Sequence, residues 1–469
     1  MTIVLAAVNA RFTHASPVLR YLRNAIESVS GQGAMQEILL REYHIGQNRL
    51  DIVRDLVLAA PDVLLLSVYI WNAEIISAIL PDLRAMLPAC RLIIGGPEAG
   101  YNAASWLAAH PELDLVVSGE GESAVAVLAR AGFSTGAYPD RLMAAPPVDF
   151  AAVPMPYRAE DFKALEHRYL YYESSRGCPF ACSYCLSSRS DHGLRFKPAS
   201  LVKAELEEIL AFRPMLVKFV DRTFNADKAR AREIWSFLMN DAKARDLSSG
   251  DASEAPALTR FHFEVHPALL EDADFTLLAL APPGLFQFEI GVQTIHERTR
   301  REIHRTGKWE HERAAIQRLI GFRNIHIHLD MITGLPFEGM DEVGASFREL
   351  SSLDADHFQI GFLKGLPGTE MRERAGEYGL VFQAAPPYTI LQSSTLSAGD
   401  LAVLARLEEL YDNIGNTGKY ASEMARASSI HGGSFAAYLA LSTYCQESGF
   451  DIRTRNEVRI RELLAAWLQ

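Results

Sequence analysis

Cysteine is scarce in this sequence, with five residues in 469, and no apolar run approaches the ~20 residues that cross a bilayer. Cys90 and Cys445 stand alone, so the chain has no disulfide framework and fits a reducing cytosol. The first ten residues are apolar but lack a basic region and a cleavage site, so no secretory signal peptide is predicted. These absences argue against a disulfide-stabilised secreted domain and a membrane protein, and predict a cytoplasmic protein.

Basic residues are also fewer than acidic ones. The chain has 46 Lys and Arg against 58 Asp and Glu, a net charge of −12, and no basic tail. Because nucleic acids and anionic membranes bind proteins through positive charge, we expect neither as a partner. The hydrophobic fraction of 49% and charged fraction of 22% are those of a globular enzyme. At ~100–200 residues per domain, two to four domains are expected.

Apolar strands alternate with helical segments through residues 1–138. Five strands are predicted, at Ile3–Val8, Glu37–Glu42, Val63–Val68, Arg91–Ile94 and Leu113–Ser118. Strands buried on both faces by helices are typical of parallel sheets, so this region is predicted to be a doubly wound, Rossmann-like α/β domain. No G-x-G-x-x-G dinucleotide fingerprint follows the first strand.

Prolines cluster in residues 139–165, which are predicted to form a semi-rigid linker. Residues 166–375 contain six further strand–helix units, and a polar insertion at Ser248–Pro256 interrupts them. Their strands are predicted at Tyr169–Ser174, Leu216–Asp221, Phe261–His266, Leu285–Gly291, Ile325–Met331 and His357–Leu363. This pattern predicts a partial (β/α)6 barrel with reactive groups at the carboxyl ends of its strands. Residues 376–469 are predicted to form a helical C-terminal domain.

Three cysteines, Cys178, Cys182 and Cys185, follow the first predicted barrel strand. Their spacing can hold three irons of a [4Fe–4S] cube from one loop, and without a fourth cysteine one iron stays open to another ligand. A zinc site of the three cysteines with His192 is the alternative that the spacing leaves.

The cysteine loop and the following Arg195-Phe196-Lys197 resemble the radical S-adenosylmethionine (SAM) superfamily, whose motif is C-x3-C-x2-C. Later segments resemble that family's strand-end signatures in the same order: Phe219–Arg222, Phe263-Glu264, Glu289–Gln293, Gly334–Pro336 and Leu366–Thr369. The resemblance implies that the open iron binds the methionyl amine and carboxylate of SAM. It also implies that the reduced cluster cleaves SAM to a 5′-deoxyadenosyl radical, with a flavodoxin or ferredoxin as electron donor.

Four residues are implied by position to bind SAM. Asp221 would lie near the methionyl group, although the family usually has a Gly-Gly-Glu-like motif there, and an Asp221–Arg222 ion pair is the alternative. Glu264 would hold ribose or methionyl groups, or else be a buried barrel carboxylate with a basic partner. Gln293 matches the family's Gly-Val-Gln, and Gly334 would let the backbone approach adenine unless it is a turn glycine.

A second set of polar residues shares one face of the fifth barrel strand. His326, His328 and Asp330 alternate with apolar residues, so their side chains point the same way. The spacing could bind a metal ion, but interior barrel residues satisfied by hydrogen bonds are favoured.

The N-terminal domain resembles the cobalamin-binding domain that precedes the barrel in one large radical SAM subgroup. Ser67, Gly95 and Gly96 match contacts to the nucleotide tail of the cofactor, and Glu120 after the fifth strand fits as well. Many cobalamin proteins carry Asp-x-His-x-x-Gly after the first strand, with the His on cobalt. The aligned residues here are Asn9, Arg11 and His14, with Arg11 at the ligand position.

The resemblance implies that the domain binds cobalamin without a histidine imidazole of the protein coordinated to cobalt. In the alternatives, His14 contacts the corrin or a phosphate, or the domain binds no corrinoid.

The implied reaction is transfer of a methyl group from cobalamin to an unreactive carbon of a small-molecule substrate. The run Phe219–Asn225 and the helical tail resemble one uncharacterised branch of these proteins, and that resemblance implies no particular reaction. A non-methylating rearrangement or cyclisation, tRNA or rRNA modification and a zinc-stabilised binding module are the alternatives. We expect the carboxyl edge of the first sheet to face the cysteine loop, with Tyr69 or Trp71 lining a shared cavity and Tyr388 as a wall.

Overall fold

The computed structural model describes residues 1–29, 37–189, 193–248 and 258–469. Its N-terminal domain is a six-stranded sheet of order β2-β1-β3-β4-β5-β6 in which every pair is parallel. The strands are β1 (Thr2–Asn9), β2 (Glu37–His44), β3 (Val63–Ser67), β4 (Arg91–Gly95), β5 (Leu115–Ser118) and β6 (Leu142–Ala144). The predicted Rossmann-like sheet is confirmed, and β6 adds an edge strand from the proline-rich segment. The strand order reverses between β1 and β3, the position at which open α/β sheets bind ligands.

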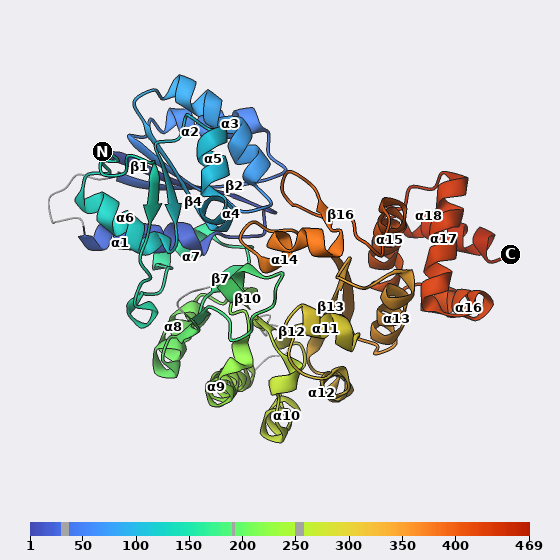
Figure 1. The fold of residues 1–469 in the computed structure, drawn as a ribbon. Helices are drawn as coiled ribbons and strands as arrows, with labels where there is room; N and C mark the ends of the chain where they lie inside the picture. Colours follow the sequence, from blue (N-terminus) through green and yellow to red (C-terminus); the bar gives the residue numbers. More distant parts are fainter. Residues whose placement is uncertain (30–36, 190–192, 249–257) are drawn as a thin grey trace.

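Helices cover both faces of this sheet (Figure 1). They are α1 (Pro17–Val29), α2 (Arg49–Leu58), α3 (Ala73–Met86), α4 (Pro97–Tyr101), α5 (Ala103–Ala109) and α6 (Gly121–Arg130). Alternate residues of β1 enter two separate cores: Val4 packs with α2, α3 and α5, and Ile3 packs with α1 and α6. Burial on both faces explains why the strands are almost continuously apolar.

The proline-rich segment 139–165 is packed against its neighbours. Besides β6 it contains a 3-10 turn, η1 (Phe150–Ala152), and a short helix, α7 (Ala159–Ala164). The Arg23 guanidinium of α1 donates to both carboxylate oxygens of Asp161 at 2.9 and 2.7 Å. Tyr157 also donates to the carbonyl oxygen of Tyr171 at 2.7 Å, so this segment ties the sheet to the first barrel strand.

The central domain is an open barrel of six parallel strands in sequential order. The strands are β7 (Leu170–Tyr172), β10 (Leu216–Phe219), β11 (Arg260–Glu264), β12 (Phe286–Gln293), β13 (His326–Thr333) and β14 (His357–Phe362). The outer helices are α8 (Ala199–Ala211), α9 (Lys228–Ser248), α10 (Asp272–Leu278), α11 (Glu297–Glu302), α12 (Trp309–Phe322) and α13 (Met340–Ser351). The predicted partial barrel is confirmed. Residues 249–256 of the predicted insertion lie outside the described residues.

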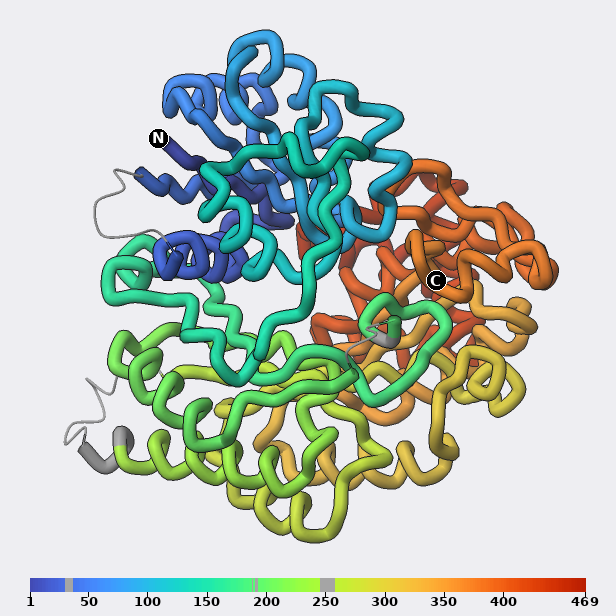
Figure 2. Tube along the Cα trace, turned by 60° about the vertical axis from the view of Figure 1, so that its left-hand side comes forward, coloured from blue at the N-terminus to red at the C-terminus, as the bar shows by residue number. Residues whose placement is uncertain are grey.

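The C-terminal region begins with α14 (Glu370–Glu373), the turn η5 (Ala375–Tyr378) and a hairpin of β15 (Val381–Phe382) and β16 (Ile390–Gln392). Helices follow, as predicted: α15 (Ala398–Leu410), continued by the π-helical turn Tyr411–Gly415, then α16 (Ala421–His431), α17 (Ser434–Ser448) and α18 (Glu457–Trp467). These helices stand beside α13 at one end of the barrel (Figures 1 and 2). Within the described ranges, no helix is both long and apolar enough to cross a membrane.

Candidate functional site

The cysteine loop leaves the barrel through a two-residue ribbon. Strand β8 (Ser175–Arg176) pairs antiparallel with β9 (Arg195–Phe196), so the chain enters and leaves the loop at one point. Gly177 has φ +93°, and a Cβ built there would lie 2.3 Å from the carbonyl oxygen of Gly193. Only glycine fits this close approach of the two arms, which turns the three cysteines toward the mouth of the barrel.

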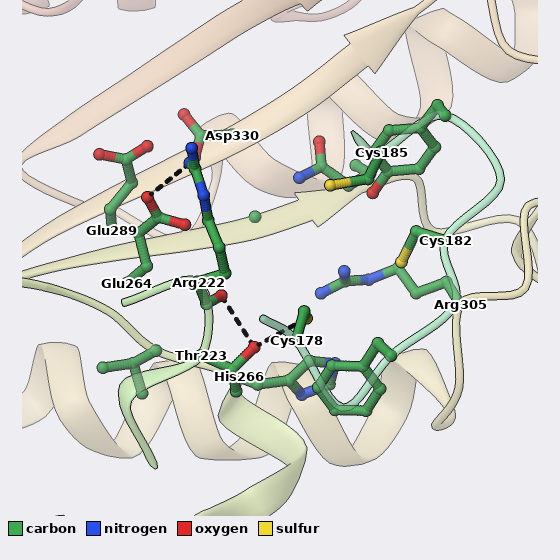
Figure 3. Close-up of a pocket in the computed structure, with 15 residues that line it drawn as sticks. Cys178, Cys182, Cys185, Arg222, Thr223, Glu264, His266, Glu289, Arg305 and Asp330 are labelled. Carbon is green, nitrogen blue, oxygen red and sulfur yellow. Dashed lines mark hydrogen bonds and ion pairs between the residues drawn. The ribbon is translucent and has the colours of Figure 1, made fainter. Parts of the chain in front are cut away.

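One cavity brings the cysteine loop together with the carboxyl ends of the barrel strands (Figure 3). The loop contributes Cys178, Phe180, Cys182, Tyr184 and Cys185. The barrel contributes Arg222, Thr223, Glu264, Val265, His266, Glu289, Gly291, Gln293, Arg305 and Asp330. The sequence predicted the three cysteines, Glu264 and Gln293 to share a site, and the structure does bring these five together.

The donor set fits an iron–sulfur cube. In the part of the chain that the structure describes, no three His, Cys, Asp or Glu side chains converge closely enough to hold one metal ion. The cysteines of a cube bind separate irons and need not converge. The Arg305 guanidinium lies beside the Cys182 thiol, where its charge complements an anionic cluster, whereas the Arg222 guanidinium points toward Glu264 (Figure 3). His192, the alternative zinc ligand, lies outside the described residues.

Asp221 lies beneath the cavity and does not line it. Its buried carboxylate accepts hydrogen bonds from the Ser174 N–H at 2.9 Å and from the hydroxyls of Ser174 and Ser175, each at 2.6 Å. Asp221 thus fastens the end of β7 to the start of the cysteine loop. The predicted alternative, an Asp221–Arg222 ion pair, is also absent from the described contacts, because Arg222 pairs with Glu264 at 3.3 Å.

Glu264 ends β11 inside the cavity, with Arg222 as its basic partner (Figure 3). Burial raises the pKa of this carboxyl to about 7, against the opposing effect of the Arg222 charge. The neighbouring carboxylate of Glu289 accepts from His262 Nε2 at 3.0 Å. Burial raises the pKa of Glu289, but the bond to His262 and the charges of His262, His328 and Lys218 together outweigh it, so the net shift is downward. Of these two carboxyl groups, Glu289 therefore stays ionised and Glu264 titrates near neutral pH.

We expect Glu264→Gln to reduce the loss of thermal stability between about pH 5 and about pH 8. Because the folded-state pKa is raised to about 7, the protonated carboxyl stabilises the fold at low pH, and this contribution is lost as the pH rises from about 4.5 through about 7. Glutamine has no proton to release. The midpoint of thermal unfolding, followed by tryptophan fluorescence across this range, measures the effect. A difference between wild type and variant that is the same at every pH would refute the assignment.

Gln293 lines the cavity from a bulge at the end of β12. Its side chain folds over Gly291, where a Cβ would lie 2.1 Å from Nε2, and its Oε1 is buried with no hydrogen-bond partner in the part of the chain that the structure describes. This unsatisfied oxygen fits a polar ligand in the cavity. Gly334 is not among the lining residues; a Cβ there would lie 3.0 Å from two Ile390 side-chain carbons.

His326, His328 and Asp330 do not form a metal site within the described residues. His328 Nε2 lies 3.0 Å from Asp330 Oδ1, whereas His326 lies 4.0 Å from Asp356 at the other end of the strand. Burial raises the pKa of Asp330, against the opposing effect of His328. His328 and Asp330 make the barrel interior polar, but among the described residues His328 Nε2 and Asp330 Oδ1 have no hydrogen bond of normal geometry, and His326 is exposed, so the prediction of hydrogen-bonded interior residues is met only in part.

The loop after β1 is docked on the barrel. Asn9 donates to the carbonyl oxygen of His14 at 3.0 Å and to Glu42 at 2.9 Å, which shapes the loop. His14 Nδ1 lies 2.6 Å from the Tyr171 hydroxyl on β7, and Arg11 is exposed. The imidazole of His14 therefore already has a partner from the barrel.

Ser67, Gly95 and Gly96 form a notch at the carboxyl edge of the sheet. Gly96 has φ +109°, and a Cβ there would lie 2.6 Å from the carbonyl oxygen of Val68, so only glycine lets β3 and β4 end so close together. Ser67 Oγ is buried there, and no described residue forms a hydrogen bond with it. A free buried hydroxyl beside a glycine pair fits the nucleotide tail of a corrinoid.

Glu120 connects the sheet to the cysteine loop. Its carboxylate accepts from Arg195 at 2.5 Å and from the Val148 N–H at 2.6 Å. Arg176, the cross-strand neighbour of Arg195, donates to Glu122 at 2.5 Å and lies 3.4 Å from Glu120. The two arms of the cysteine loop thus bind the acidic loop after β5.

One further contact joins the carboxyl edge of the sheet to the rest of the chain. Glu98, two residues after Gly96, accepts from the buried Tyr388 hydroxyl at 2.5 Å. Tyr69 and Trp71 stack on each other at 4.4 Å, and burial raises the pKa of Tyr69 to about 12. Neither of them nor Tyr388 is among the residues that line the cavity at the cysteines, so their expected place in its wall is not met.

The sequence did not single out three lining residues of the cavity, Thr223, His266 and Arg305, whereas Tyr184, expected to shield the cluster, does line it. Thr223 Oγ1 lies 3.5 Å from Cys178 Sγ. The run Phe219–Asn225 was the available signal for Thr223. In this run Asp221 holds the start of the cysteine loop, Arg222 lines the cavity, and Thr223 contacts Cys178. Arg305 had no such signal, because it reaches the site from a turn after α11.

Three family profiles cover most of the chain. The B12 binding domain matches residues 7–129, the radical SAM superfamily matches 172–350, and a protein family of unknown function, DUF4080, matches 376–469.

Curated relatives include the 2-(S-pantetheinyl)-carbapenam-3-carboxylate methyltransferase of Streptantibioticus cattleyicolor, 25% identical over 68% of this chain and 50% of the relative. The cobalamin-dependent radical SAM methyltransferase TokK of Streptomyces tokunonensis is 24% identical over 68% of this chain and 50% of its own. An uncharacterized methyltransferase of Pyrococcus horikoshii is 26% identical over 61% of this chain and 62% of its own. The chain thus spans about half the length of the first two relatives.

Solved structures share the fold at low identity. The radical SAM methyltransferase TsrM of Kitasatospora setae, with tryptophan and a SAM analogue bound, has a TM-score of 0.63 at 17% identity, covering 82% of this chain and 79% of TsrM. The cobalamin-dependent radical enzyme OxsB, with aqua-cobalamin bound, has a TM-score of 0.65 at 14% identity, covering 99% of this chain and 78% of OxsB. The chain thus shares the fold of these structures, and its match to the B12 binding domain precedes its match to the radical SAM superfamily.

Proposed function

We propose that the protein is a cobalamin-dependent radical SAM methyltransferase that acts on an unreactive carbon of a small molecule. The observation that carries the proposal is the docking of the sheet's carboxyl edge on the barrel mouth, through His14–Tyr171 and Glu120–Arg195. A methyl carrier held at that edge and a radical source held by the cysteines would share one space.

Each cofactor has a set of residues that would hold it. Cys178, Cys182 and Cys185 would bind the [4Fe–4S] cluster, with Glu264 and Gln293 contacting SAM. Ser67, Gly95 and Gly96 would hold cobalamin. When bound, the cluster and SAM supply the one-electron chemistry that activates a C–H bond, and cobalamin supplies the methyl group.

The chain's own side chains orient and shield the reactants. Arg222 and Glu264 present a paired cation and carboxyl to polar groups of a ligand. Phe180 and Tyr184 line the cluster side of the cavity with aromatic surface, which excludes water from a reactive carbon. Asp221 acts through Ser174 and Ser175, since it holds the start of the cysteine loop in place.

The direct test is turnover under anaerobic reduction, with cluster, cobalamin and SAM supplied and candidate metabolites offered singly. We expect a methylated product together with S-adenosylhomocysteine and 5′-deoxyadenosine. A product of unchanged methyl count, formed without S-adenosylhomocysteine, would instead show a rearrangement or cyclisation. No cleavage of SAM by protein with a full cluster would overturn both.

Cobalamin is expected to bind without a histidine on cobalt. Arg11 stands at the usual ligand position, and the His14 imidazole is already bonded to Tyr171 at 2.6 Å. The electron paramagnetic resonance spectrum of the cobalt(II) state should therefore show no superhyperfine splitting from a protein nitrogen. Splitting that disappears in His14→Ala would identify His14 as the ligand and contradict the expectation.

We further propose that a flavodoxin or ferredoxin in the cytoplasm reduces the cluster. The net charge of −12 supports a small molecule rather than a nucleic acid as substrate.

A further inference from the structure

His266 is a polar side chain in the cavity that the proposed chemistry leaves without a role. It follows β11, is 7% exposed and lines the same cavity as the three cysteines. Among the described residues neither ring nitrogen has a hydrogen-bond partner, and Nδ1 is fully enclosed. An imidazole N–H buried without an acceptor costs free energy, so a purely structural histidine would normally be bonded.

The backbone of His266 is held in place by one residue. Asn225 accepts from the His266 N–H at 2.9 Å and donates to the His266 carbonyl oxygen at 2.9 Å. Asn225 lies in the 3-10 turn η3 (Phe224–Ala226), two residues after Thr223, whose hydroxyl is 3.5 Å from Cys178 Sγ. One short segment therefore fixes both a cysteine contact and the imidazole.

The ring of His266 points to the cysteine loop. It packs on Phe180, which lies between Cys178 and Cys182, with ring centroids 4.4 Å apart. In Figure 3, His266 lies on the same side of the cavity as Thr223 and Cys178. Because Nδ1 is enclosed, Nε2 is the nitrogen open to the cavity.

The protonation state of the imidazole limits the hydrogen bonds that Nε2 of His266 can form. Burial, together with the charges of Arg305 and Arg300, lowers the pKa of His266 to about 3, so the ring is neutral and carries one proton. A proton on Nδ1 would have no acceptor among the described residues, whereas a proton on Nε2 would face the cavity that the three cysteines also line, where a cluster would place electron-rich sulfur.

We propose that His266 donates a hydrogen bond from Nε2 to a sulfur atom of the [4Fe–4S] cluster, with Asn225 as its positioning residue. The inference rests on the proposed cluster. A hydrogen bond to cluster sulfur stabilises the more negative, reduced state and so raises the reduction potential. His266 would thereby make the cluster easier to reduce.

The test is spectroscopic. Protein labelled with 15N-histidine and carrying a full, reduced cluster is examined by pulsed electron paramagnetic resonance, and its midpoint potential is measured. We expect a weak 15N coupling in the wild type that is lost in His266→Phe, which keeps the stacking on Phe180. The midpoint potential of His266→Phe should shift to more negative values, and His266→Gln, which keeps an N–H donor, should recover part of the shift. Asn225→Ala should shift the potential in the same direction as His266→Phe.

The matched control is His304→Phe. His304 contacts the cysteine loop from the exposed side, with Nδ1 3.3 Å from the Ala181 carbonyl oxygen, and should leave both readouts unchanged. An unchanged potential and unchanged coupling in His266→Phe would overturn the hydrogen bond, as would a strong coupling typical of direct iron ligation. Iron and sulfide content separates this result from failure of the proposed function: a protein that assembles no cluster overturns both, whereas a full cluster with no histidine coupling overturns only the role of His266.

Discussion

Replacement of Cys178, Cys182 or Cys185 by alanine is expected to abolish assembly of the [4Fe–4S] cluster and, with it, all cleavage of SAM. The three residues line one cavity, and the other cysteines, Cys90 and Cys445, are buried away from it. A cube held at three points has no spare protein ligand, so loss of one thiolate leaves two irons open. Iron and sulfide content, the absorption of the reconstituted protein and the yield of 5′-deoxyadenosine measure the effect.

Cys90→Ala and Cys445→Ala are the matched controls. Cys90 packs in the core between the sheet and α3, and Cys445 packs in the helical C-terminal region. Each substitution removes one buried sulfur atom at a modest cost in stability and should leave iron content and SAM cleavage at wild-type levels. Wild-type iron content in any of the three loop variants would refute the cluster assignment.

Gly96→Ala is expected to prevent cobalamin binding while leaving the cluster in place. The new Cβ would lie 2.6 Å from the carbonyl oxygen of Val68, at a backbone φ of +109° that disfavours any side chain. β3 and β4 must then move apart at the notch that contains Ser67. Because the cysteine loop is anchored in the barrel, iron content should be unchanged. Retention of cobalamin on gel filtration, read from its absorption, measures the effect.

Gly132→Ala is the matched control: it tests the effect of backbone strain at a left-handed glycine without a collision that moves β3 and β4 apart. Gly132 lies in the same domain with φ +60°, but a Cβ there meets no atom within 4 Å. This variant has a similar left-handed backbone without the collision and should bind cobalamin as the wild type does. Equal binding by Gly96→Ala and wild type would remove the glycine notch as the cobalamin site and would weaken the methyl-transfer proposal with it.

Whether a site residue could be predicted depended on which side chains it binds in the folded protein, as Asp221 and Arg222 show. Asp221 and Arg222 are adjacent at one strand end, and Asp221 was expected either to bind SAM or to pair with Arg222. In the structure the Asp221 carboxylate accepts hydrogen bonds from Ser174 and Ser175. Of the two residues, only Arg222 therefore lines the cavity. Successive side chains along an extended chain point to opposite sides, and which side faces the cavity depends on contacts far away in sequence.

The sequence by itself determined the features that depend on local pattern: the two series of parallel strands, the helical tail and a cysteine loop spaced for three irons. Near-continuous apolar strands and short ligand spacings are local properties, and no distant partner is needed to recognise them. Only the tertiary structure decided that Glu120 pairs with Arg195, that His14 contacts Tyr171, and that His266 Nδ1 has no hydrogen-bond partner among the described residues. The first two outcomes depend on how two domains dock, and docking joins residues up to 290 positions apart, as in the pair Glu98–Tyr388. The third depends on which residues the folded barrel brings to the cavity.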